Sequence, residues 1–558
     1  MRPARLTLFL ASAVFIIPAC RASDSAVPTP QQIVRAADSI SADQIRAHMT
    51  FLADDLLEGR ETGSRGYDLA AAYVSSAFDA LGLEPGGDGG TFFQRVPFRR
   101  SQIIPDDSSL RFLKNGTVQT LKYGVDYVAR PEFQRTRSSV DAPLVFVAYG
   151  VTAPELHHDD YGQIDARGKI VVIVRGAPET FPHDERAYYS STLVKIKNAA
   201  DHGAVGMFWV RTAQQEKRSS FDRFARASEG GALQWVDSQG NVSGMNAQIV
   251  FQATLSPSGL STILSGAVKP LYEMLESAKR GEVVSFNLVG RVQAVETSRH
   301  AALSSTNVVA ILRGADPFLK NEFVVITAHL DHLGVGDAVN GDTIYNGAYD
   351  NASGVSSMLE VARALASLSR RPARSVMFIA LTGEEKGLQG SDYFVAHPTV
   401  PLSSIVADVN LDMFLTLYRV QDVVAFGGEH SSLGEVVDRA AREVGWKMSP
   451  DYNPSEALFV RSDQFSFVKR GVPSVFLVSG LETGSPGIKG RELNDAWIAS
   501  KYHSRGDDLS QSFDFPSMVN FARLNLLITW SVADTPERPH WNADDFFGRR
   551  FGKNNVMP

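Results

Sequence analysis

The sequence predicts an α/β fold with a mixed, largely parallel central sheet flanked by helices. A short apolar run at 324–326 is suited to a buried strand, and RSVMFIALTG at 374–383 resembles a second one. Between them, apolar residues recur at helical spacing, at Val355, Met358, Leu359, Ala362 and Leu365. Strand, helix and strand in this order favour parallel neighbours in one sheet. A third apolar run, VADVNLDMF at 406–414, extends the same pattern.

Side chains that bind metals or transfer protons follow these runs. Ligands of parallel sheets collect beyond the carboxyl ends of the strands, so residues at these positions are candidates for one site. Asp350 lies on a loop bracketed by Gly347 and Gly354, where an irregular backbone is accessible. The candidate side chains, in chain order, are His329, Asp350, Glu384, Glu385, Asp412 and His503.

Their residue types point to a metal-dependent hydrolase. Two imidazoles and three carboxylates suit two Zn²⁺ ions that share one carboxylate and keep open positions for water and substrate. Glu384 and Glu385 are adjacent on an extended chain and point in different directions, so one is expected to be a ligand and the other a base. Asp331 shares a strand face with His329, and its carboxylate is expected to accept the second ring N–H.

In order, residue type and approximate spacing, this set resembles the dizinc exopeptidases of the MH clan, which include bacterial leucyl aminopeptidases, glutamate carboxypeptidases and the metal-free transferrin receptor. The resemblance covers roughly residues 40–130 and 290–535. It implies that Asp350 bridges two Zn²⁺ ions per chain, with a cis peptide bond after it. It also implies the remaining roles: His329 and Asp412 on one ion, Glu385 and His503 on the other, and Glu384 as general base.

The predicted catalytic domain is interrupted. Between about 138 and 290, short β-rich runs such as KIVVIVRG alternate with Gly and Pro turns. This segment resembles the protease-associated (PA) domain, on the stretch from AYGVTAPELHHDDYG to KIVVIVRG. The catalytic domain is then expected in two parts, 39–137 and 291–534, and the chain ends in a tail at 535–558 that is expected to pack back on it.

The first residues predict export. Arg2 and Arg5 precede an apolar run too short to span a bilayer, as in a secretory signal at 1–20. The signal ends in Cys20, the only cysteine, in a stretch that resembles a bacterial lipobox. We expect a periplasmic or cell-surface lipoprotein. The alternative is an ordinary signal peptide and a secreted protein. Residues 21–38 are polar, contain two prolines and are expected to form a linker.

The composition limits the partners. Lys and Arg number 55 against 62 Asp and Glu, so the basic excess typical of nucleic-acid binders is absent. Peptides are the expected substrates, a lipid anchor is the only expected membrane contact, and the oligomeric state is left open. The run RSDQFSFVKRGVP also resembles the family. It places four residues near a substrate cleft, with a structural turn as the alternative: Arg461, Ser462, Asp463 and Gln464.

The sequence therefore predicts an exported zinc exopeptidase, and first of all an aminopeptidase that uses a dizinc-activated water. One alternative is a carboxypeptidase or dipeptidase of the glutamate carboxypeptidase type. Such an enzyme needs a basic group for the free carboxylate, and Arg461 is the candidate. A one-zinc glutaminyl cyclase would not need the full ligand set. A receptor-like module would not need the ligands or Glu384. The preferred side chain and the native metal stay open.

Overall fold

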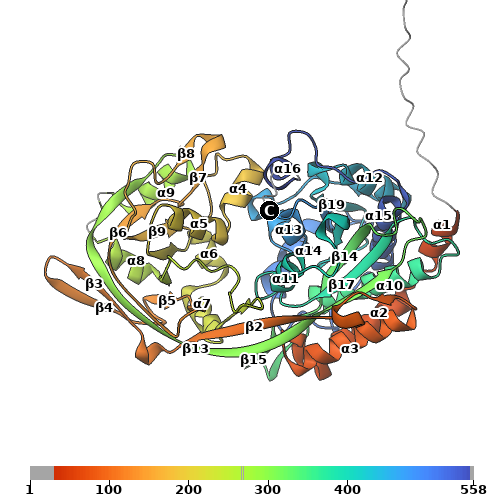
Figure 1. The fold of residues 1–558 in the computed structure, drawn as a ribbon, viewed down its shortest axis with the longest axis horizontal. Helices are drawn as coiled ribbons and strands as arrows, with labels where there is room; N and C mark the ends of the chain where they lie inside the picture. The colour runs from red at the N-terminus through yellow and green to blue at the C-terminus, as the bar shows by residue number, and fades with distance from the viewer. Residues whose placement is uncertain (1–30, 266, 268, 553–558) are drawn as a thin grey trace, which may run out of the picture.

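The computed structural model describes residues 31–265, 267 and 269–552, which form two lobes joined by two long strands (Figure 1). These strands are β2 (Phe93–Ile103) and β13 (Ser285–Leu312), and all of β2 pairs antiparallel with residues 298–308 of β13. At its C-terminal end β13 joins the sheet of the main lobe, and at its N-terminal end it joins the sheet of the insertion lobe. The two sheets therefore share one continuous strand.

The sheet of the main lobe is mixed and largely parallel, as the sequence predicts. Its central strand β14 (Phe323–His329) lies between β17 (Ser375–Leu381) and β18 (Ile405–Asn410), and all three are parallel. Next, β21 (Ser474–Ser479) is parallel to β18, and β19 (Asp422–Phe426) is antiparallel to β21. Every residue of the three central strands is buried, because helices cover both faces of the sheet.

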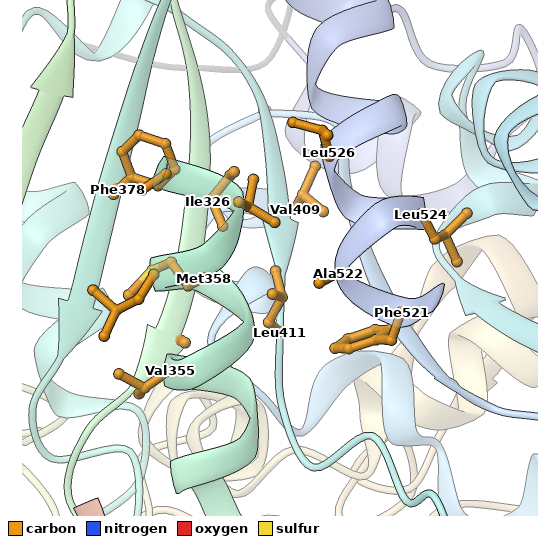
Figure 2. Packing of buried hydrophobic residues seen from close by; sticks show 14 of the residues in the cluster. Ile326, Val355, Met358, Phe378, Val409, Leu411, Phe521, Ala522, Leu524 and Leu526 are labelled. Atoms are coloured by element: carbon orange, nitrogen blue, oxygen red, sulfur yellow. The ribbon is translucent and has the colours of Figure 1, made fainter. Parts of the chain in front are cut away.

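Successive strand residues point into different cores. Ile326, Phe378 and Val409 face α10 (Gly354–Ala366) and α15 (Phe515–Asp534), as Figure 2 shows. The same core includes α2 (Ala42–Leu52) and α3 (Arg65–Ala80). On the opposite face, Val325 and Ile379 pack against α11 (Gln389–Ala396) and α13 (Gln464–Val468). This packing fixes the strand ends that carry the candidate residues.

The insertion lobe is an α/β unit in its own right. Four parallel strands form the centre of its sheet: β6 (Arg137–Val147), β9 (Ile170–Val174), β10 (Gly206–Val210) and β12 (Phe251–Leu255). One face packs on α5 (Thr192–Asp201). The other packs on α8 (Pro257–Ile263) and α9 (Leu271–Lys279).

The insertion begins earlier than residue 138, so that predicted boundary is wrong. Three strands before it belong to the insertion lobe: β3 (Ser109–Lys114), β4 (Thr117–Leu121) and β5 (Tyr127–Ala129). β3 pairs with β13, and β5 pairs with β12. Leu110 and Phe112 also enter the core formed with α8 and α9. These pairings join residues far apart in the sequence, which local patterns do not reveal.

The predicted linker also needs correction. Residues Gln31–Asp38 form helix α1, whose Ile33, Ala36 and Ala37 are buried in the core of the main lobe. Their spacing gives the helix one apolar face, so this part of 21–38 packs instead of acting as a tether. Cys20 and the signal at 1–20 lie outside the described residues. Within 31–265, 267 and 269–552, no helix is both long and apolar enough to cross a bilayer.

The C-terminal segment packs back on both lobes, as expected. Helix α16 (Phe546–Phe551) buries Phe546 and Phe547 against the main lobe. His430 Nδ1 lies 2.6 Å from Asp545 Oδ2, at the start of α16, and 3.7 Å from Asp184 Oδ2 in the insertion lobe. The guanidinium of Arg550 stacks 4.0 Å from the ring centroid of Tyr188, also in the insertion lobe. The tail therefore holds the two lobes together.

One buried arginine ties the N-terminal segment to the candidate site. Arg60 is 1% exposed, and its Nε donates to Leu330 O at 3.0 Å. Its Nη1 donates to Asn346 O and Leu52 O, and its Nη2 donates to Gly347 O. Burial lowers the pKa of Arg60 to about 10, against the opposing charges of Asp507 and Asp350. The group therefore stays protonated near neutral pH.

We predict that Arg60→Met lowers the free energy of unfolding by about 3–5 kcal/mol, because buried carbonyls lose their donor. Urea denaturation measures this change. Arg65→Met is the matched control, since the Arg65 side chain is 74% exposed and a change within about 0.5 kcal/mol is expected there. A similar small change for Arg60→Met would contradict the role given to Arg60.

Candidate metal centre

Imidazole and carboxylate groups meet at the carboxyl ends of β14, β17 and β18. His329 Nε2 lies 3.1 Å from Asp412 Oδ1 and 3.2 Å from Asp350 Oδ1. His503 Nε2 lies 3.2 Å from Asp350 Oδ2 and 3.2 Å from Glu385 Oε2. One oxygen of Asp350 therefore faces His329, and the other faces His503. The structure brings together all five predicted ligands.

The loop that carries Asp350 is fixed by its main chain. The peptide bond between Asp350 and Asn351 is cis, as the resemblance implies. The main-chain N–H groups of Tyr349 and Asp350 donate to the two oxygens of Asp507, at 2.9 and 3.0 Å. Asn351 Nδ2 donates to Leu411 O, beside Asp412. These bonds set the carboxylate of Asp350 between the strand ends.

The donors fit a pair of metal ions. Tetrahedral ligands bound at about 2.0–2.2 Å to one Zn²⁺ lie about 3.3–3.6 Å apart, close to the 3.1–3.2 Å between these nitrogen and oxygen atoms. Asp350 and His329 are 4% and 1% exposed, so water does little to screen the repulsion between the carboxylates of the site. Imidazole nitrogens and carboxylate oxygens are ligands that Zn²⁺ commonly takes in proteins.

The second nitrogen of His329 has a different partner from the predicted one. Its Nδ1 lies 3.1 Å from the main-chain oxygen of Asp331, whereas the Asp331 carboxylate is 4.0 Å away. That carboxylate instead accepts from Thr62 Oγ1 at 2.9 Å and from the main-chain N–H of Glu384 at 3.1 Å. A proton on Nδ1 leaves the Nε2 lone pair free to face the carboxylates of Asp350 and Asp412. Asp331 therefore positions the backbone of Glu384 and not the ring.

Glu384 and Glu385 lie in environments that separate their pKa values. Burial, with the added charges of Glu385 and Asp412, raises the pKa of Glu384 well above its ordinary value. Burial and Asp350 also act to raise the pKa of Glu385, but hydrogen bonds from His332 and His503 lower it to about 2. A high-pKa acid beside a permanently charged one is typical of a base next to a ligand.

His332 was missed in the sequence. Its Nδ1 lies 2.8 Å from Glu385 Oε1 and its side chain is buried. With Asp350 and Glu385 it forms a group that could hold a metal ion. The signal was present in the HLDH stretch, where a second imidazole follows His329 by three residues. Asp507 was missed as well, because nothing in its local pattern shows that it reaches the loop of Asp350.

Three of the four residues predicted near the cleft are buried behind the metal ligands. Ser462 Oγ donates to Asp412 Oδ2 at 2.5 Å and accepts from Asn410 Nδ2 at 2.8 Å. Gln464 also binds Asn410 and is buried. Asp463 is buried too, and burial raises its pKa to about 7. These three residues therefore lie close to the predicted ligands, and their side chains are turned inward because α13 begins here. Arg461 is exposed and pairs with Glu456 at 3.1 Å.

The chain is similar to known peptidases. Residues 307–529, which hold all six predicted site residues from His329 to His503, match the model of Peptidase family M28. The chain is 26% identical over 325 residues to a "probable leucine aminopeptidase 2" of Aspergillus oryzae, covering 56% of this chain and 60% of that protein. It is 26% identical over 294 residues to a "Probable zinc metalloprotease" of Pyricularia oryzae, covering 47% and 56%. The chain thus spans less than two thirds of these relatives.

The fold has a solved counterpart. An aminopeptidase from Aneurinibacillus sp. strain AM-1 superposes with a TM-score of 0.52 at 20% identity, covering 91% of this chain and 97% of that one. At this identity the likeness shows the fold alone.

The hydroxyl of Ser462 gives a direct test of the ligand set. We predict that Ser462→Ala weakens Zn²⁺ affinity about 10–100-fold, because Asp412 loses the group that orients its outer oxygen. Competition with a fluorescent chelator measures the affinity, and circular dichroism checks the fold. Ser455→Ala, at an exposed serine, serves as the control. Unchanged affinity in Ser462→Ala would show either that Asp412 is not a metal ligand or that Ser462 does not orient it.

Proposed function

We propose that this chain, whose residues 307–529 belong to peptidase family M28, is an exported dizinc exopeptidase that removes N-terminal residues from peptides. The observation that carries the proposal is the position of the Asp350 carboxylate. It lies between two pairs of side chains, each made of one imidazole and one carboxylate, and Glu384 lies beside them. The names of the relatives support peptide substrates and zinc. The insertion is proposed to be of the PA type.

His329, Asp350 and Asp412 would hold one Zn²⁺, and Asp350, Glu385 and His503 the other. When bound, the ions supply Lewis acidity, which polarises a carbonyl and favours ionisation of a water molecule near neutral pH. His332 contacts the outer oxygen of Glu385 and holds that carboxylate in place. Asp331 holds the main chain of Glu384, so the base is oriented from its own backbone.

Glu384 is the proton carrier in this proposal. Its raised pKa favours uptake of a proton from the attacking water, and the same carboxyl can then deliver the proton to the leaving amine. Glu385, held ionised by His332 and His503, is unsuited to this role. The different environments of the two neighbours support this division into base and ligand.

The environment of Arg461 favours an aminopeptidase over a carboxypeptidase. A carboxypeptidase needs a free cation to bind the terminal carboxylate of its substrate, and Arg461 was the candidate. Its guanidinium is already paired with Glu456. A receptor-like module is disfavoured because such a protein has no use for the buried ligand set or for a buried base.

We predict that Glu384→Gln keeps both metals and the substrate affinity while lowering kcat about 10²–10⁴-fold, the usual contribution of a positioned base. Glu385→Gln should lower metal content instead, because a neutral amide replaces a charged ligand. Elemental analysis and steady-state kinetics of both variants separate the roles. Near-normal kcat in Glu384→Gln would show that another group is the base.

Specificity for a free N-terminus gives a second prediction. Peptides with a free α-amino group should be cleaved, whereas their N-acetylated forms should be turned over at least about 100-fold more slowly if the amine is bound in the transition state. A paired panel of free and acetylated peptides measures this ratio by mass spectrometry. Equal turnover, or preference for a free C-terminus, would favour the carboxypeptidase alternative.

The proposed lipid anchor depends on Cys20. We predict that the wild-type protein partitions with membranes and that Cys20→Ala releases it or blocks processing. Cell fractionation with mass spectrometry of the mature N-terminus measures both. A mature N-terminus beyond Cys20 without a lipid would leave the secreted alternative.

A further inference from the structure

We propose that the insertion lobe carries an oxyanion-binding site, for a phosphate or carboxylate group, formed by Arg130 and Arg175 beside Trp209. This site lies outside the metal centre and is independent of the proposed peptidase activity. No residue of the ligand set contributes to it.

The two arginines follow two strands of one sheet, β5 and β9, which are separated by β12 and β10. Arg130 follows β5, and its main-chain N–H donates to Gln252 O in β12 at 2.9 Å. Arg175 follows β9, and its main-chain N–H donates to Val210 O in β10 at 3.1 Å. Trp209 lies between, with Nε1 donating to Gln252 Oε1 at 3.3 Å. The guanidinium carbon of Arg175 is 5.2 Å from the centroid of the Trp209 ring.

These groups share the face of the sheet that packs on α5. Phe208 and Val210 point to the opposite core, so Trp209 between them points toward α5. Phe251 and Ala253 likewise point away, which puts Gln252 on the face of Trp209. Arg130 is paired with Gln252 along the sheet and therefore belongs to the same face.

The positive charge here is not balanced. Among the described residues, neither the Arg130 nor the Arg175 guanidinium makes an ion pair or hydrogen bond, and both side chains are half-buried. Burial and then repulsion from Arg130 and Arg211 lower the pKa of Arg175 to about 10. By contrast, Arg211 binds Glu216, with Nε and Oε2 2.7 Å apart. Unpaired, partly dehydrated cations are costly and typical of sites that bind anions.

Nearby charges add to the imbalance. Lys195 of α5 is buried, and its pKa is lowered to about 7 by burial, with Asp160 opposing and Arg175 contributing. The Asp160 carboxylate is already bound to Val151 N–H at 2.9 Å and to His158 Nε2 at 3.0 Å. It is therefore unavailable to the arginines. Guanidinium groups bind phosphate and carboxylate through two parallel hydrogen bonds, which makes an oxyanion the fitting occupant.

The test uses the full chain and the tryptophan fluorescence of the protein. Inorganic phosphate and, separately, succinate are titrated at constant ionic strength set with chloride. A saturable change is expected for one of them, and the better ligand identifies a phosphoryl or a carboxylate group. Arg130→Gln and Arg175→Gln should each weaken binding at least about 10-fold. Arg167→Gln, at an exposed arginine paired with Asp165, should bind like the wild type.

Stability gives a second readout. In chloride buffer Arg175→Gln should raise Tm by about 2–4 °C, because one of two repelling cations is removed. The better oxyanion should raise the Tm of the wild type but not that of the variant. The proposal is overturned if neither anion binds better than chloride, if the Arg130 and Arg175 variants bind like the wild type, or if Arg175→Gln lowers Tm.

Discussion

The position of the Asp350 carboxylate is the constraint on which the site depends. Each of its oxygens faces a different imidazole, so a shift of the loop would move the carboxylate away from both imidazoles at once. Asp507 fixes the loop through two main-chain N–H groups, and Arg60 holds the carbonyls of Leu330 and Gly347 on either side. Much of the buried polar network of the main lobe therefore serves one carboxylate.

The same arrangement is unfavourable without cations. Asp350, Glu385 and Asp412 lie close together with little exposure, and Glu384 adds a further acid. Bringing such charges together in a site of low polarity costs free energy unless protons or metals balance them. Metal binding would thus add to the stability of the folded chain, since the unfolded chain has no preformed site. The parallel sheet makes the convergence possible by ending three strands at one edge.

The fold class and five of the six candidate site residues could be predicted because those five lie at the end of a buried strand or on the glycine-bracketed loop, signals that are local in the sequence. His503 lies in a loop that contains a single glycine, Gly506, which is a weaker signal. The cis bond at Asp350 followed only from the family resemblance. His332, Asp507 and Ser462 act on the ligands through contacts between distant segments, which no local pattern encodes. The insertion boundary was missed for the same reason, since β3 and β5 pair with strands far along the chain. Helix α1 looks like a linker in the sequence because it has few apolar residues, and these become buried only through contacts with the distant helices α10 and α15.

Anomalous diffraction at the zinc edge, on crystals of the full chain grown with Zn²⁺, tests the central claim most directly. We expect two peaks, one on each side of the Asp350 carboxylate, with His329 and Asp412 on one and Glu385 and His503 on the other. We also expect that Asp350→Asn lowers the occupancy of both. A single peak, or two peaks that persist unchanged in Asp350→Asn, would contradict the shared carboxylate.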